Sequence, residues 1–161
     1  MPNVKPVRSC ESLATIALPN TTIDSAAVDP SNPGICRVTA FATHPPAGDK
    51  VRIRISIPTS NWNGRLLGLR GGGFSGDSLA GVDQPATLGY ASGSTDTGHE
   101  GGSDSFAMDA NGRLNWQLIR DNAHVGIHEM TITGKALTQA IYGVASRYSY
   151  FNGCSTGAGR A

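Results

Sequence analysis

The chain has 161 residues, enough for one domain with a hydrophobic core, and a formal net charge of +1 at pH 7. A nearly neutral chain is a poor match for a nucleic acid, and no apolar segment approaches the roughly 20 residues of a membrane-spanning helix. With 21 glycines, few aromatic residues and no apolar signal-peptide segment before Ser9, the composition favours a loop-rich α/β or β domain over a helical bundle.

The first third of the chain predicts an antiparallel hairpin after an irregular start. Residues 1–35 show no helical or strand periodicity, so we expect an irregular N-terminal segment. Cys36–Thr43 has the composition of a strand, and Val51–Ile57 alternates apolar residues with polar ones. That period of two indicates a half-buried strand whose Arg52 and Arg54 face solvent.

Three cysteines bear on the redox environment of the protein. Cys10 and Cys36 flank a segment rich in turn-forming residues and are candidates for a disulfide, which leaves Cys154 unpaired. On these residues alone a disulfide is favoured, and three reduced, buried cysteines in a cytosolic protein remain the alternative.

Arg65–Arg70 reads as a buried strand that leads into the glycine-rich segment Gly71–Gly76. Consecutive glycines after a strand indicate that the backbone bends sharply or approaches another group closely. One interpretation is an oxyanion loop, whose backbone N–H groups stabilise the negative charge that develops during acyl transfer. A plain surface loop is the simplest alternative.

The same glycines also match a dinucleotide-binding fingerprint. Gly71, Gly73 and Gly76 have the G-x-G-x-x-G spacing, and Asp96 lies about 20 residues further on. That fingerprint requires a helix to begin within the glycines. Residues 77–88 contain a Gly and a Pro and no apolar stripe of helical spacing, so we expect no helix there and prefer the oxyanion interpretation.

A further strand is predicted at Tyr90–Thr95, followed by a polar loop that contains Asp96 and His99. Residues three apart in one loop rarely form the extended line of a catalytic triad, so we expect a hydrogen-bonded loop near the site. No third ligand stands at a useful spacing for a metal ion, and His44 and His124 carry no functional prediction.

The segment Glu100–Gly112 is polar and reads as a loop, and helical character begins at Leu114. Apolar residues then recur at spacings of four and three, at Met130, Gly134, Leu137, Ile141 and Val144. The pattern predicts a helix of about four turns that covers a sheet and ends near Gly143. His128 and Glu129 are expected in its first turn, without a chemical role.

The chain closes on a pattern typical of a nucleophile elbow. The predicted strand Tyr148–Asn152 runs into Gly153-x-Ser155-x-Gly157. In such an elbow the serine sits at a sharp, strained turn from a strand into a helix, and the glycines avoid collisions with neighbouring backbone. Together the elements predict residues 1–161 to be a single, incomplete α/β domain: an antiparallel hairpin, then parallel strands with crossover helices.

Several motifs in this order resemble the tannase and feruloyl esterase family, whose members are α/β-hydrolases. The motifs are Trp62-Asn63-Gly64, Gly71-Gly72-Gly73-Phe74, Ser94-Thr95-Asp96-Thr97-Gly98-His99, His128-Glu129-Met130-Thr131 and Gly153-Cys154-Ser155-Thr156-Gly157. The resemblance begins near Cys36. It implies an esterase for small aromatic ester substrates, of the hydroxycinnamic or gallic acid type, with Ser155 as the nucleophile. Thr156 and a glycine of the Gly72-Gly73 pair would supply the oxyanion-hole N–H groups.

The resemblance also bears on cysteines, on localisation and on what lies outside this chain. It implies a Cys10–Cys36 bridge, a disulfide from Cys154 to a cysteine beside a downstream catalytic histidine, and a secreted or periplasmic protein. The catalytic acid, the histidine and a lid domain, in which calcium is possible, would follow Ala161, so this segment is expected to be inactive and to hold no cofactor or metal. One departure is Ala158, where the family usually has glycine.

Overall fold

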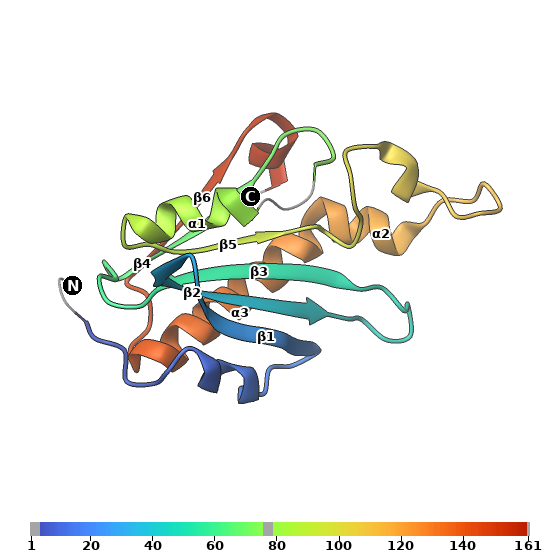
Figure 1. Ribbon diagram of the computed structural model, residues 1–161. Coiled ribbons are helices and arrows are strands. Elements are labelled where there is room, and N and C mark those ends of the chain that lie inside the picture. The colour runs from blue at the N-terminus through green and yellow to red at the C-terminus, as the bar shows by residue number, and fades with distance from the viewer. Residues whose placement is uncertain (1–3, 76–78, 161) are drawn as a thin grey trace.

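The computed structural model describes residues 4–75 and 79–160. Its described strands form a six-stranded sheet that runs between helices on its two faces (Figure 1). The strands are β1 (Thr21–Asp29), β2 (Asn32–Ala42), β3 (Val51–Pro58), β4 (Arg65–Arg70), β5 (Ala91–Thr95) and β6 (Tyr148–Gly153). The helices are α1 (Leu79–Thr87), α2 (Trp116–Arg120) and α3 (Gly126–Tyr142), with a π-helical turn at Asp121–Val125 and short 3₁₀ turns at Glu11–Thr15, Asp104–Ala107 and Ser155–Arg160.

The strand order is β1-β2-β3-β5-β4-β6. The pairs from β1 to β5 are antiparallel, and β4 pairs in parallel with both β5 and β6. Helix α1 connects β4 to β5, and α2 with α3 connects β5 to β6, so both parallel connections cross over through helices. The predicted α/β class, with an antiparallel hairpin leading into parallel strands, is confirmed. Within the described residues, no helix combines the length and the apolar character needed to cross a lipid bilayer.

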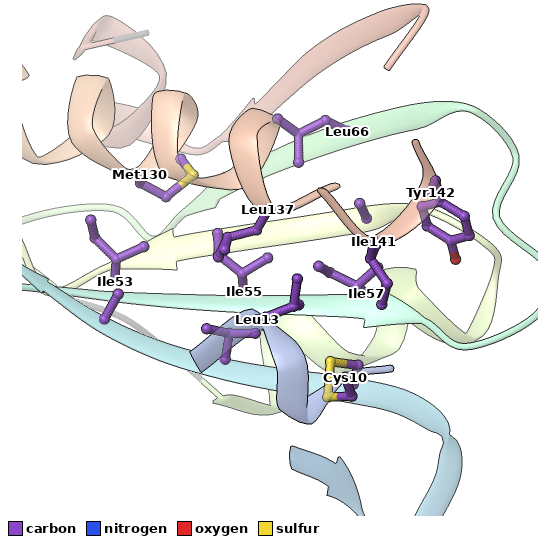
Figure 2. Close-up of a cluster of buried hydrophobic side chains, with 14 of the residues drawn as sticks. Cys10, Leu13, Ile53, Ile55, Ile57, Leu66, Met130, Leu137, Ile141 and Tyr142 are labelled. Carbon is purple, nitrogen blue, oxygen red and sulfur yellow. A yellow bond between two sulfur atoms is a disulfide. The ribbon is translucent and has the colours of Figure 1, made fainter. Parts of the chain in front are cut away.

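The main hydrophobic core lies between α3 and one face of the sheet (Figure 2). Its buried side chains come from alternate positions of β3 and from one face of α3, namely Ile53, Ile55, Ile57, Met130, Leu137 and Ile141. Burying one aliphatic side chain stabilises a fold by about 1.5–3 kcal/mol. Packing of this layer therefore holds α3 against the sheet more than intrinsic helix propensity does.

An aromatic pair closes the end of the core near the C-terminus of α3. The rings of Trp62 and Tyr142 stack with their centroids 4.4 Å apart, and both side chains are buried. Their polar atoms are satisfied, because the Trp62 indole donates to the Arg65 carbonyl at 3.0 Å and the Tyr142 hydroxyl donates to the Pro58 carbonyl. Burial raises the pKa of Tyr142. The sequence motif at Trp62 thus fixes the loop from β3 to β4.

The expected irregular segment at residues 1–35 is wrong for its second half. Residues 21–29 form β1, and β2 begins at Asn32 instead of Cys36. The pairing of β1 with β2 shifts register between Ile23 and Ser25. A register shift of this kind interrupts the alternation of inward and outward side chains, which is why no period of two was visible.

The expectation that residues 77–88 contain no helix is also wrong, although Asp77 and Ser78 lie outside the described residues. Helix α1 spans Leu79–Thr87 and includes Pro85 in its last turn. Among the α1 residues whose side chains are described, the buried apolar ones are Val82 and Ala86, four positions apart. Gly81 and Pro85 lie directly before them in the sequence and obscure a helical pattern.

Charged contacts hold α1 against the second face of the sheet. The Asp83 carboxylate accepts hydrogen bonds from the Arg37 guanidinium at 2.5 Å and from the Ser56 hydroxyl at 2.6 Å. Arg37 also pairs with Asp29 at 2.8 Å. Since Arg37, Ser56 and Asp83 come from β2, β3 and α1, these contacts replace the missing apolar area.

Two other expectations need correction. The arginines of β3 are half-buried, and Arg52 pairs with Asp96 at 3.7 Å and Glu100 at 3.2 Å instead of facing open solvent. The helix is also longer than predicted, because α2, the π-helical turn and α3 follow one another without a break. Glu129 lies in the first turn of α3, as expected, and is buried, whereas Val144 lies past the helix end at Gly143.

The Cys10–Cys36 disulfide joins the N-terminal segment to β2 across a separation of 26 residues, and both cysteines are buried. We expect the Cys10→Ala/Cys36→Ala double variant to lose about 3 kcal/mol of unfolding free energy, since the unfolded chain is no longer closed into a loop. Urea unfolding followed by circular dichroism, with and without reductant, measures this. Reductant should destabilise the parent protein and leave the double variant unchanged. An unchanged midpoint for the reduced parent would contradict the prediction.

Leu137 is fully buried at the centre of the α3 layer. We expect Leu137→Ala to reduce the unfolding free energy by about 2–5 kcal/mol, because the truncation leaves a cavity that the core fills only in part. Lys135→Ala, on the exposed side of the same helix, is the matched control and should change stability by about 0.5 kcal/mol or less. Equal effects of the two variants in urea unfolding would show that α3 is not packed as described.

Candidate active site

The parallel pairing of β4 and β6 sets the position of the two candidate loops. Arg70 at the end of β4 pairs with Gly153 at the end of β6. The glycine loop, which we define as Gly71–Ser75, and the elbow, defined as Cys154–Gly157, therefore leave the sheet side by side from the carboxyl ends of neighbouring strands. This is the edge of a parallel sheet at which α/β proteins place ligands.

The elbow has the backbone geometry that the sequence pattern predicts. Ser155 has a φ of 52°, in the left-handed region that residues with a side chain rarely occupy. Its side chain is exposed, and a 3₁₀ turn begins at this residue. A Cβ on Gly157 would lie only 2.4 Å from the Gly71 carbonyl oxygen, so no other residue fits there without moving the loop. The strand before the elbow differs from expectation, because β6 is largely exposed in this chain.

The glycine loop touches the elbow directly. A Cβ on Gly72 would lie 3.2 Å from the Cys154 carbonyl oxygen and 3.4 Å from Ser155 Cβ. The Thr156 hydroxyl donates a hydrogen bond to the Gly73 carbonyl at 2.5 Å, which ties the two loops together. The structure thus brings Ser155, Thr156, Gly72 and Gly73 into one place.

Hydrogen bonds also orient the peptide planes of the glycine loop. The Gly72 carbonyl accepts from the Ser75 N–H at 3.3 Å. In a trans peptide the N–H points opposite to the carbonyl, so the N–H of Gly73 faces away from Ser75. Gly73 itself has a φ of 63°. The Ser75 N–H thus holds the peptide group between Gly72 and Gly73, and the Thr156 hydroxyl holds the next one. Peptide groups in fixed orientations are what an anion-binding loop requires.

A series of hydrogen-bonded polar side chains connects the end of β4 and the long helix to the glycine loop. The Arg70 guanidinium donates to the Asn122 side-chain and backbone carbonyl oxygens. The Thr97 hydroxyl lies 3.2 Å from Asn122 Oδ1 and 3.3 Å from His99 Nδ1. His99 Nε2 lies 2.8 Å from the Phe74 carbonyl oxygen, within the glycine loop. We call Arg70, Phe74, Thr97, His99 and Asn122 the loop-support network.

The protonation of His99 follows from its neighbours. Because the Phe74 carbonyl can only accept a hydrogen bond, Nε2 of His99 carries the proton and donates it there. The ring also stacks on Phe106, with centroids 4.1 Å apart, and Phe106 meets Phe74 edge-on at 5.6 Å. His99 is thus buried and fully engaged in holding the loop.

Asp96, the acidic residue of the same loop as His99, bonds to backbone N–H groups. The Asp96 carboxylate accepts hydrogen bonds from the backbone N–H groups of Arg52 and Gly98, both at 2.8 Å. It is 6% exposed. The expected hydrogen-bonded loop near the site is therefore what the structure shows, with Asp96 shaping its own loop and His99 bonded to Phe74 of the glycine loop.

These contacts also bear on the dinucleotide alternative. Helix α1 and the parallel β4–β5 pair do form a strand–helix–strand unit, with Gly71 and Gly73 between β4 and α1, and the helix is contrary to our expectation. Gly76 lies outside the described residues. The Asp96 carboxylate, however, is buried and bonded to its own loop, so it does not face outward to bind a ribose.

No described histidine hydrogen-bonds to the Ser155 hydroxyl. His99 is bonded within the loop-support network, His44 contacts Asp49 at 2.6 Å, and His124 and His128 are exposed on the long helix. Among the described residues, the Ser155 hydroxyl therefore lies beside the glycine loop without a histidine partner. Cys154, next to the serine, is an exposed free thiol.

Arg70, Asn122 and Phe106 were missed as candidate residues. The one sequence feature that could have identified Arg70 is its position as the last residue of a predicted strand. Asn122 reaches the network only because the π-helical turn at Asp121–Val125 shifts the register of the helix. A π turn has no dependable sequence pattern, so this contact was not predictable.

Comparisons with known proteins agree with this geometry. A family model described as "Tannase and feruloyl esterase" matches residues 36–161. A probable feruloyl esterase from Arthroderma benhamiae is 37% identical over 144 residues, which are 86% of this chain and 25% of that protein. The tannase of Aspergillus oryzae is 35% identical over 131 residues, 76% of this chain and 22% of that protein.

Solved structures show the same similarity. The crystal structure of feruloyl esterase B from Aspergillus oryzae superposes with a TM-score of 0.75 and 25% identity, over 94% of this chain and 32% of that chain. This chain spans about a quarter of the length of the curated relatives just described. These matches are to esterases and give the dinucleotide alternative no support. Since the family model covers more than half of the chain, the chain belongs to the tannase and feruloyl esterase family.

Proposed function

We propose that this chain carries the nucleophile and the oxyanion-binding loop of a serine carboxylic ester hydrolase. The observation that carries the proposal is Ser155 in a left-handed turn beside Gly72. The names of the relatives, feruloyl esterase and tannase, support esters of aromatic acids of the hydroxycinnamic or gallic type as the substrate class.

In the proposed reaction the Ser155 hydroxyl attacks the ester carbonyl and loses its proton to a histidine. Negative charge collects on the carbonyl oxygen, where the N–H of Thr156 and the N–H of Gly72 or Gly73 stabilise it. Collapse of this intermediate releases the alcohol and leaves an aromatic acyl group on Ser155. Water then attacks the acyl-enzyme, and the acid leaves as the serine regains its proton.

We further propose that the catalytic histidine and its acid are residues other than those described above. Support comes from the surroundings of the described histidines, which are engaged elsewhere or exposed. Cys154, exposed and unpaired beside Ser155, would pair with a cysteine next to that histidine. The Cys10–Cys36 disulfide supports an oxidising location, secreted or periplasmic. A lid domain with calcium would be a further part of the same enzyme.

The first test replaces the proposed nucleophile in the longest natural form of the protein. We expect Ser155→Ala to lower kcat for methyl ferulate or methyl gallate by at least about 10⁴-fold, because no other group takes over the acyl transfer. Hydrolysis is followed by absorbance of the released acid. Ser149→Ala, an exposed serine on β6, is the matched control and should keep full activity.

The 161-residue chain alone should show no turnover in the same assay, since no described histidine hydrogen-bonds to Ser155. Turnover by the short chain that depends on Ser155 would contradict the proposal that the base lies elsewhere. Turnover that survives Ser155→Ala in the longer protein would refute the serine mechanism itself.

A second test addresses the support of the oxyanion loop. We expect His99→Phe, which keeps an aromatic ring against Phe106 but removes the donor to the Phe74 carbonyl, to lower kcat about 10- to 100-fold. Removal of a whole oxyanion donor from an enzyme costs about 3–4 kcal/mol, and a displaced loop should cost somewhat less.

The matched control for this test is His124→Phe, at an exposed position. KM should change little for His99→Phe, because the loop acts mainly on the transition state. His99→Gln, which restores a donor, should recover part of kcat. A loss that appears in KM alone, or one that Gln does not relieve while the melting temperature is unchanged, would exclude a role for this hydrogen bond.

A further inference from the structure

A second group of ionisable side chains lies away from the elbow, where the β2–β3 hairpin loop meets the long helix. His44 and Asp49 come from the loop, Asp121 opens the π-helical turn, and Glu129 lies on α3. We call these four residues the hairpin–helix cluster. Three of its members are carboxylic acids, and the proposed esterase mechanism uses none of them.

The hairpin half of the cluster is rigid. Asp49 Oδ1 accepts a hydrogen bond from the His44 backbone N–H at 2.9 Å, and Oδ2 lies 2.6 Å from His44 Nδ1. The Asp49 side chain is 1% exposed. On the other side of the ring, His44 Nε2 faces Glu129 Oε1 at 3.5 Å and is buried without a hydrogen-bond partner among the described residues.

The helix half of the cluster contributes a buried acid that is only half satisfied. Asp121 is fully buried, and its Oδ1 accepts from the Gln117 amide at 2.9 Å. Its Oδ2 has no hydrogen-bond partner within the described part of the chain. One ligand atom each from His44, Asp49 and Asp121 lie within 4.8 Å of one another.

The charge of the cluster is poorly balanced. Three carboxyl groups, all on buried residues, surround one histidine, so at most one positive charge within the cluster opposes three negative ones. A buried carboxylate without compensation is costly.

We propose that His44, Asp49 and Asp121 bind a divalent transition-metal ion, with Zn²⁺ as the best match. An imidazole nitrogen with carboxylate oxygens is a donor set for zinc, whereas calcium and magnesium prefer oxygen alone. The ion takes the place of the proton between His44 Nδ1 and Asp49 Oδ2, and that proton leaves to solvent. His44 Nε2–H then faces Glu129, in the way that a second carboxylate commonly orients a zinc-bound histidine.

The geometry needs only a small adjustment for this. Ligand atoms around a tetrahedral zinc ion lie about 3.4 Å apart at bond lengths of about 2.1 Å. The 2.6 Å contact of His44 with Asp49 would therefore open, and the widest separation, at most 4.8 Å, would close by up to about 1.4 Å. The π-helical turn begins at Asp121 itself, and such turns are often found where a helix presents a residue to a ligand.

The test is titration of the purified protein with ZnCl₂, by calorimetry and by thermal unfolding. His124 and His128 are exposed four residues apart and offer a competing surface site, so the measurements are made in a His124→Ala/His128→Ala background. We expect one equivalent of zinc to bind, with net release of protons detected as a dependence of the heat on the buffer. At a hundredfold excess over Kd the melting temperature should rise by about 5 °C or more.

Asp121→Asn is the variant that separates the possible outcomes. It is nearly isosteric and removes a poorly compensated charge, so the metal-free protein should be as stable as the parent or more stable. It should lose the zinc-dependent rise in melting temperature and weaken binding at least tenfold. His44→Gln should do the same if Asp121→Asn does not fold, and Asp109→Asn, in an exposed turn, should keep the zinc effect.

If protons alone balance the charge of the hairpin–helix cluster, the zinc titration gives a different result. The background variant would then show no saturable binding and no zinc-dependent stabilisation, although Asp121→Asn would still stabilise the protein. That outcome would overturn the proposal, as would zinc binding that survives both Asp121→Asn and His44→Gln. Activity is not part of the test, so its result is independent of the proposed esterase function.

Discussion

The arrangement of the candidate site depends on a close approach of two backbones, at Gly157 and Gly71. Gly157 passes the Gly71 carbonyl so closely that a Cβ there would be 2.4 Å from the oxygen. The contact exists because β4 and β6 are in register and both end at this edge. It forces the chain to turn at Ser155, in a conformation that costs on the order of 1–3 kcal/mol and persists only when the surroundings hold it.

The hydrophobic core and the loop-support network form the surroundings that hold the turn at Ser155. Packing of α3 on the sheet fixes β4 and β5, Phe151 of β6 packs against the same core, and the stacked Trp62 and Tyr142 rings close the end of that layer. From the sheet edge, Arg70 and Asn122 connect to Thr97 and His99, whose imidazole holds the glycine loop. The strained backbone conformation of Ser155 is therefore held in place by a hydrophobic core on one side and by buried hydrogen bonds on the other.

The long helix participates in two polar assemblies because of its π-helical turn. Asp121 and Asn122 are adjacent in the chain, yet Asn122 enters the loop-support network and Asp121 enters the hairpin–helix cluster. The first assembly joins its side chains to the glycine loop by hydrogen bonds within the protein. In the second, His44 Nε2 and Asp121 Oδ2 are buried without hydrogen-bond partners among the described residues, and buried polar atoms of that kind point to a ligand or a proton that completes them.

The sequence alone determined the elements whose pattern is local. Strict alternation predicted β3, apolar spacing predicted most of α3, and G-x-S-x-G with the preceding strand predicted the turn at Ser155, because each of these depends on residues that are neighbours in the chain. Tertiary structure decided the rest. It decided β1, where a register shift breaks the period, and α1, which is held by Asp83 and its partners more than by an apolar stripe. It also decided which residues meet Ser155 and His99, since contacts between segments far apart in sequence depend on strand order and register, which no local pattern encodes.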